Sequence, residues 1–176
     1  MKKLFFFMSI FAVMALMTVS CSKDDDDDDN TDSTENRLKF ANKLTQNATS
    51  FTWEGYETTK TRSWGNWSDD GKKFVVMRFD RASKDATEGE GMLFQFENEW
   101  KENFIDKSEF RWSFADDELR ITYRHSGWAP VHAEYRTSEL VIDGNKFEGT
   151  WFESSDKKFE FSYKKSSFND WDKYQE

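Results

Sequence analysis

The chain has almost no cysteine: of its 176 residues, Cys21 is the only one. A single cysteine excludes a disulfide within the chain, so the domain is not held together in the way of small disulfide-rich exported proteins. Histidine is also scarce, with His125 and His132 on either side of a loop-like SGWAPV segment. Zinc needs further Cys, His or carboxylate ligands, so we interpret both as polar loop-edge residues. We expect no bound metal and no cofactor.

The sequence lacks the short motifs of common enzymes. It has no GxSxG nucleophile elbow, no HExxH zinc motif and no phosphate-binding loop. The EGEG stretch at 88–91 is acidic and would repel phosphate. Some pair of its 34 acidic residues will reach the spacing of a glycosidase by chance. Carboxylates that alternate with large apolar residues are expected on the solvent face: Glu54, Glu97, Glu148 and Glu160. We expect no enzymatic activity, with a hydrolase as the weakest alternative.

Excess positive charge is absent. The formal charge is −9, and removal of residues 1–20 with Lys2 and Lys3 would change it to −11. Six of these charges come from Asp24–Asp29, so the remaining domain is only mildly acidic. Nucleic acids and anionic lipid surfaces attract basic patches, so both are poor candidates for partners.

The N-terminus has the layout of an export signal. Two lysines precede an apolar stretch from Leu4 to Val19, and the small residue Ser20 stands before Cys21. This is typical of a signal peptide over residues 1–20 and is too short for a stable membrane span. The segment TVSC resembles a bacterial lipobox, although Thr18 stands where Leu is usual. The resemblance implies lipid attachment at Cys21; the alternative is a secreted protein with a free thiol.

Six consecutive aspartates follow the cysteine and Lys23. Adjacent like charges repel, so residues 21–34 are expected to form a disordered, extended tether. A calcium loop would need alternating ligands and a glycine, which the run lacks. The stretch CSKDDDD resembles the export signal of Bacteroidetes lipoproteins. It implies a location on the outer face of the outer membrane, anchored by lipid.

Residues 35–176, about 140 in number, are expected to form one domain. This part is rich in aromatic residues that can fill a core. A short helix is expected at 35–44, where apolar residues recur every three or four positions. Period-two alternation then predicts eight strands, at 50–59, 72–79, 91–100, 109–114, 118–125, 132–143, 146–153 and 158–164.

Turn-forming clusters separate these strands, among them SDDG at 68–71 and DGN at 143–145. Short loops and half-polar alternation favour consecutive antiparallel hairpins. We therefore predict an all-β fold, an eight-stranded antiparallel up-and-down barrel with a short N-terminal helix. A two-sheet sandwich is the alternative.

Several core motifs resemble the lipocalin-like domains of Bacteroidetes lipoproteins over residues 50–165. They are GEGMLFQF, FRWSFADDELRITY, YRTSELVIDGNKFEGTW and KKFEFSYKK. The resemblance implies a small calyx-like barrel at the cell surface and no particular reaction. The tail at 166–176 lies outside the pattern.

Aromatic residues are the candidates for binding. A ligand cavity would be walled by strand residues: Trp53, Met92, Phe94, Trp112, Tyr123 and Trp151. Surface recognition would use three tryptophans expected in loops: Trp64, Trp67 and Trp128. The leading hypothesis is a monomeric carrier of a small apolar or amphipathic ligand. The alternative is a filled domain that contacts a glycan or an envelope protein. The direction of Arg78, a polar residue in an apolar run, is left open.

Overall fold

The alternating segments form one antiparallel sheet in the computed structural model, which describes residues 28–115, 118–124, 131–136 and 139–174. The sheet holds eight strands of six residues or more and the two-residue strand β7. The strands are β1 (Ser50–Ser63), β2 (Asn66–Asp80), β3 (Glu88–Phe96), β4 (Phe104–Ala115), β5 (Glu118–Arg124), β6 (Val131–Arg136), β7 (Val141–Ile142), β8 (Lys146–Ser154) and β9 (Lys157–Lys165).

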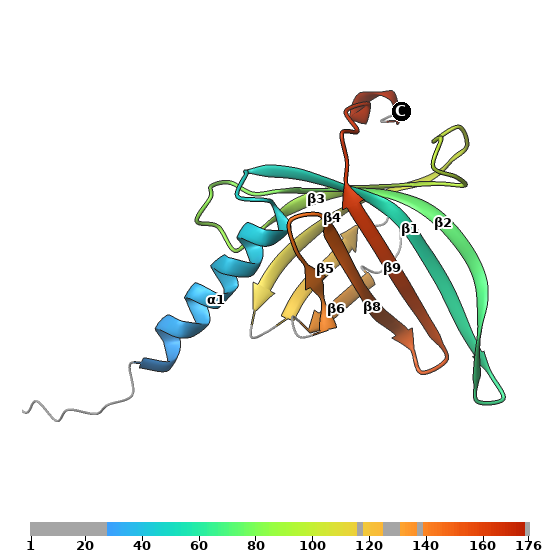
Figure 1. Ribbon diagram of the computed structural model, residues 1–176, viewed down its shortest axis with the longest axis horizontal. Helices are drawn as coiled ribbons and strands as arrows, with labels where there is room; N and C mark the ends of the chain where they lie inside the picture. The colour runs from blue at the N-terminus through green and yellow to red at the C-terminus, as the bar shows by residue number, and fades with distance from the viewer. Residues whose placement is uncertain (1–27, 116–117, 125–130, 137–138, 175–176) are drawn as a thin grey trace, which may run out of the picture.

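The strand order is β6-β5-β4-β3-β2-β1-β9-β8-β7. Strands that follow one another in sequence pair with each other, except β6 and β7 at the two ends of the order, and β1 also pairs with β9. The sheet curls through 221° into a half-barrel (Figure 1). This confirms the predicted up-and-down antiparallel fold and excludes two stacked sheets. The architecture is consistent with a lipocalin-like fold.

Several predicted boundaries differ from the structure. The strand expected at 91–100 ends at Phe96, and the one expected at 109–114 begins at Phe104. The run at 132–143 divides into β6 and β7. The first hairpin turns at Trp64 and Gly65 instead of at 68–71, and Ser63 pairs with Asn66 across it. The φ angles of Trp64 and Gly65 are 53° and 85°, as a type I′ turn requires. Its twist matches that of the flanking strands, so the hairpin extends past the SDDG cluster.

Helix α1 spans Asp28–Leu44 and begins seven residues before the predicted 35–44 segment, within the part assigned to the tether. Its last turn is buried in the concave core, where the Leu44 carbonyl accepts a 2.8 Å hydrogen bond from Trp53 Nε1. None of the helices in the described part of the chain is long and apolar enough to cross a membrane.

The concave face is filled by aromatic rings that meet around Phe79. This β2 ring lies 5.2 Å from Phe110 and 5.9 Å from Trp112, both on β4. It also lies 5.9 Å from Phe147 on β8, measured between ring centroids. Because β1 and β9 separate β2 from β8 in the sheet, the last contact crosses the space that the sheet encloses.

A second apolar cluster lies on the convex face of β2 and β3. It consists of Phe74, Val76, Phe94, Phe96 and Trp171. The chain after β9 covers this patch with Phe168 and the 3₁₀ helix η2 (Trp171–Tyr174). Arg78 points to the same face, where its guanidinium stacks on Trp171 at 4.7 Å and bonds Asp80 at 2.8 Å. The tail therefore belongs to the fold, and Arg78 faces outward.

We predict that Gly91→Ala destabilises the protein by several kcal/mol, because a Cβ there would overlap the Phe110 ring and the Arg78 carbonyl oxygen. Gly71→Ala is the matched control in the same sheet, since no atom lies within 4 Å of its added Cβ. Denaturant unfolding measures both variants. Equal, small losses for the two would show that β3 does not approach Phe110 so closely.

Candidate functional site

Four of the six predicted wall residues share the concave core: Trp53, Trp112, Tyr123 and Trp151. Trp53 and Trp112 are 0% and 2% exposed. Trp53 packs against Phe147 at 5.8 Å, and Trp112 packs against Phe79 at 5.9 Å. Near α1, the rings expected to line a ligand cavity therefore pack against other rings of the protein.

The other two predicted wall residues, Met92 and Phe94, lie on the opposite face and are a correction to the prediction. Leu93 belongs to the concave core, whereas Phe94 is buried in the convex cluster with Met92 packed against it. The stretch MLFQF has apolar residues at both parities, so alternation alone does not identify its inner face. Both faces are buried because the C-terminal segment covers the outer one.

The concave face also holds a buried carboxyl group, Glu57 on β1, which is 9% exposed. Burial raises the pKa of Glu57 to about 7, against the opposing effects of the Lys73 charge and the Trp151 indole. Lys73 Nζ donates a hydrogen bond to Gln95 Oε1, at 3.0 Å. Within the described part of the chain, Trp151 Nε1 is buried without a hydrogen bond of good geometry. The indole N–H therefore lowers the Glu57 pKa by lying close to the carboxyl group, without a well-formed hydrogen bond.

We predict that Glu57→Gln removes a pH-dependent loss of stability. The pKa is raised from 4.5 to about 7, so the native state retains a proton that the unfolded chain releases. This contribution is complete below pH 4.5 and is lost as pH rises through 7, by about 3 kcal/mol. Unfolding free energies from pH 4.5 to 8 should fall in the parent and stay flatter in the variant.

Glu148→Gln provides the control for this comparison. The Ser162 hydroxyl donates a hydrogen bond to Glu148 and lowers the pKa of that carboxyl, so its effect appears on the acid side of 4.5. Parallel pH profiles for the parent and Glu57→Gln would show that Glu57 ionises as an exposed carboxyl does.

The β1–β2 hairpin presents a fully exposed tryptophan at its tip. Trp64 is 99% exposed and has the left-handed φ noted above. The stem below it is held in place: Lys60 bonds Asp69 at 3.2 Å and Glu160 at 3.1 Å. The Arg62 amide also donates to the Asp156 carbonyl at 2.8 Å. The tip is thus presented on a stem that is joined to the β8–β9 turn.

Trp67 lies in β2 next to this tip rather than in the predicted loop. It is half-buried and meets the 62%-exposed Phe152 edge-on at 6.3 Å. The Lys158 ammonium lies 4.9 Å from its ring. We call Trp64, Trp67 and Phe152 the aromatic tip. Neither tryptophan belongs to a core cluster, so the expected surface position is what the structure shows for both.

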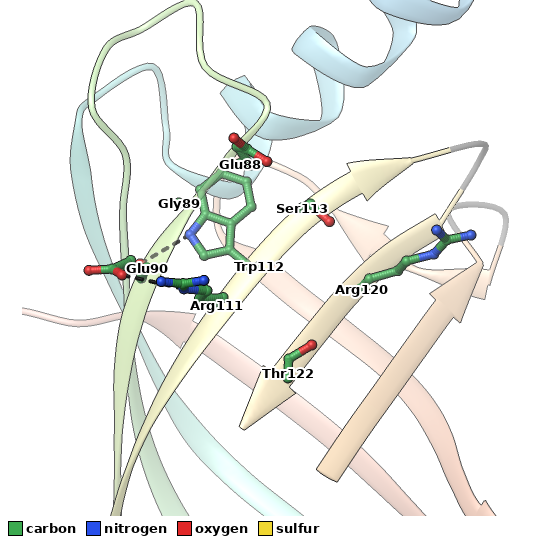
Figure 2. A pocket seen from close by; sticks show the side chains of 8 residues that line it. All are labelled: Glu88, Gly89, Glu90, Arg111, Trp112, Ser113, Arg120 and Thr122. Carbon is green, nitrogen blue, oxygen red and sulfur yellow. Dashed lines mark hydrogen bonds and ion pairs between the residues drawn. The ribbon is translucent and has the colours of Figure 1, made fainter. Parts of the chain in front are cut away.

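A groove of about 380 Å³ opens where β3, β4 and β5 run side by side (Figure 2). Its polar lining consists of Glu88, Glu90, Arg111, Ser113, Arg120 and Thr122. Glu90 Oε1 lies 3.6 Å from Arg111 Nε and 3.6 Å from Arg124 Nη2. The Trp112 indole edge reaches the groove from the core side and donates to the Glu90 carbonyl at 3.1 Å.

Sequence reasoning missed Glu57 and this groove, although signals for both exist. Glu57 has the same parity as Trp53 and Gly55, which places it on the core side of β1. Arginines occupy the polar positions 111 and 120 of two strands that pair with each other. A solvated face was the simpler interpretation of that pattern.

The signal peptide at 1–20 and the first part of the tether, up to residue 27, lie outside the described residues. So do Cys21, His125 and Trp128. The backbone of His132 lies in β6 and pairs with Thr122. Within the described ranges, no group of three or more His, Cys, Asp and Glu residues is placed to hold a metal ion.

No protein-family model matches the chain, and no curated protein matches it in sequence. The functional proposal is therefore based on the residues and their geometry.

Proposed function

We propose that this protein is a cell-surface lipoprotein of the lipocalin-like type found in Bacteroidetes, and that its aromatic tip binds a glycan. The observation that carries the proposal is the position of Trp64, 99% exposed at the end of a braced hairpin. Aromatic side chains present a large apolar face with few rotatable bonds, which suits stacking on the apolar face of a sugar ring. Polar side chains at the tip, Arg62 and Asn66 among them, are placed to contact sugar hydroxyls.

Folding alone gives no reason for tryptophan at this position. A left-handed residue other than glycine costs roughly 1–2 kcal/mol, and type I′ turns favour Asn, Asp or Gly. Full exposure also removes the benefit of burying the indole. A residue that is unfavourable for folding on two counts supports a role in binding.

The size of the aromatic tip favours a glycan over a protein partner. Large aromatic side chains bury about 150–250 Å² each, and Trp67 is already half-covered by Phe152 and Lys158. The free aromatic area is therefore below the roughly 800 Å² that each partner buries in a stable protein interface. A few sugar rings need much less surface.

Carriage of an amphipathic ligand remains the second candidate, and one observation favours it. Glu57 and the Trp151 indole N–H form a polar pair on the concave face that the protein leaves incompletely bonded. A ligand hydroxyl between them would accept from the indole and donate to the carboxylate. The ring contacts around Phe79 oppose this candidate, because they occupy the space where a ligand would be buried.

We predict that Trp64→Asn abolishes glycan binding and raises the free energy of unfolding by about 0.5–1 kcal/mol, because Asn is favoured in this turn. The full chain, purified in detergent, is applied to a glycan array and unfolded by denaturant. Trp100→Ala is the control, since Trp100 is 71% exposed on a different turn. Retained binding by Trp64→Asn, or equal loss in Trp100→Ala, would contradict the proposal.

The proposed anchor gives a separate prediction. Cys21→Ala should prevent lipid attachment and release the protein from the membrane fraction, because no other cysteine is present. Replacement of Asp24–Asp29 by serine should keep the lipid but remove the protein from the outer face. Metabolic labelling with a fatty acid and protease digestion of intact cells measure the two effects. Lipid labelling that persists in Cys21→Ala would contradict this anchor.

A further inference from the structure

The groove of β3, β4 and β5 is a candidate ligand site that shares no residue with the aromatic tip. The two are far apart: Glu90 pairs with Asp80, which pairs with Ser50 at the start of β1, whereas Trp64 follows the end of β1. Fourteen residues of β1 separate these levels, or roughly 45 Å along the strand. A ligand in the groove is therefore bound by different residues.

The groove presents charges of both signs in equal number. Glu88 and Glu90 on β3 oppose Arg111 on β4 and Arg120 on β5. A strongly anionic ligand would meet two carboxylates, and a cationic one would meet two guanidinium groups. The lining is thus matched to a ligand without net charge.

The hydroxyl groups of Ser113 and Thr122 also line the groove. Register places Ser113 between Glu88 and Arg120, and Arg111 between Glu90 and Thr122. Each row across the three strands therefore contains one carboxylate, one hydroxyl and one guanidinium group (Figure 2). Since the only aromatic side chain in the lining is the 2%-exposed Trp112, the groove offers little apolar area to an apolar ligand.

Ion pairs hold the charged groups in place without saturating them. The 3.6 Å separations of Glu90 from Arg111 and Arg124 are longer than direct hydrogen bonds. Arg120 donates from Nε and Nη2 to Glu118 Oε2 at 3.3 and 3.2 Å, which holds its guanidinium in place. Glu88 forms no ion pair within the part of the chain that the structure describes. Guanidinium donors and carboxylate acceptors thus keep hydrogen-bonding capacity that a hydroxyl-rich ligand would use.

We propose that this groove is a second binding site, specific for a neutral sugar unit. Its volume of about 380 Å³ is at the lower end of the range for small-molecule sites. Arg111 and Arg120 donate to sugar oxygens, Glu88 and Glu90 accept from sugar hydroxyls, and Ser113 and Thr122 do either. The site rests on its own residues and does not require the aromatic tip to bind.

The test uses the full chain carrying Trp64→Ala, so that glycan binding by the aromatic tip does not contribute to the signal. Calorimetric titration is performed with neutral trisaccharides of glucose, mannose, xylose and N-acetylglucosamine, and with trigalacturonate and triglycine for comparison. We expect at least one neutral trisaccharide to bind with a Kd on the order of 1 mM. Addition of Arg111→Met should weaken that binding about tenfold or more, because a charge-assisted hydrogen bond is lost.

Arg124→Met is the matched control, because Arg124 contacts the same Glu90 oxygen at the same 3.6 Å but does not line the groove. It should change the affinity by less than about twofold. Arg111 and Arg124 are both exposed, so each variant is expected to unfold at the parent temperature. Ser113→Ala, which removes only a hydroxyl, should also weaken binding and provides a second variant.

Three results would overturn the proposal: no neutral trisaccharide binds the Trp64→Ala chain, trigalacturonate or triglycine binds more tightly than all of them, or Arg124→Met weakens binding as much as Arg111→Met. Failure of the groove is distinguishable from failure of the aromatic tip. Glycan binding by the parent that is lost in Trp64→Asn supports the tip whatever the groove does.

Discussion

The structure depends on the contacts that Phe79 makes across the concave face. Its ring touches Phe110 and Trp112 on one side and Phe147 on the other, and so links strands that are not neighbours in the sheet. A sheet curled through 221° has no complete ring of strand pairing in its described part, so side-chain packing must hold the curvature. The same packing fills the end of the half-barrel near α1, so binding is expected on the surface and not in the interior.

The convex face divides into surfaces with different uses. Over β2 and β3 it is apolar and is covered by the chain's own C-terminal segment, with Trp171 and Arg78 stacked at 4.7 Å. Over β3, β4 and β5 it is polar and forms the groove, while the β1–β2 hairpin leaves its aromatic tip uncovered. The protein thus covers its larger apolar patch with its own C-terminal segment. The small aromatic tip and the polar groove stay exposed. Both exposed surfaces suit a carbohydrate ligand.

Strand positions were predictable from the sequence because alternation is a local property. Each of the eight predicted runs contains a strand, although β3 ends at Phe96 and the run at 132–143 divides in two. The Asp143-Gly144 turn forms as expected, with Asp143 Oδ1 accepting from the amides of Asn145 and Lys146. The inner face of β3 was not predictable, since both parities are apolar and the covering tail is distant in sequence. The groove was missed for a similar reason: it exists only where three strands bring their polar positions together.

Indole N–H resonances of the full chain, followed as the glycan fraction from the cell envelope is added, would distinguish surface recognition from carriage. We expect the Trp64 and Trp67 signals to shift and those of the buried Trp53 and Trp112 to stay in place. A shift of the Trp151 signal, whose N–H lies beside Glu57, with Trp64 unchanged would contradict surface recognition and indicate a ligand on the concave face.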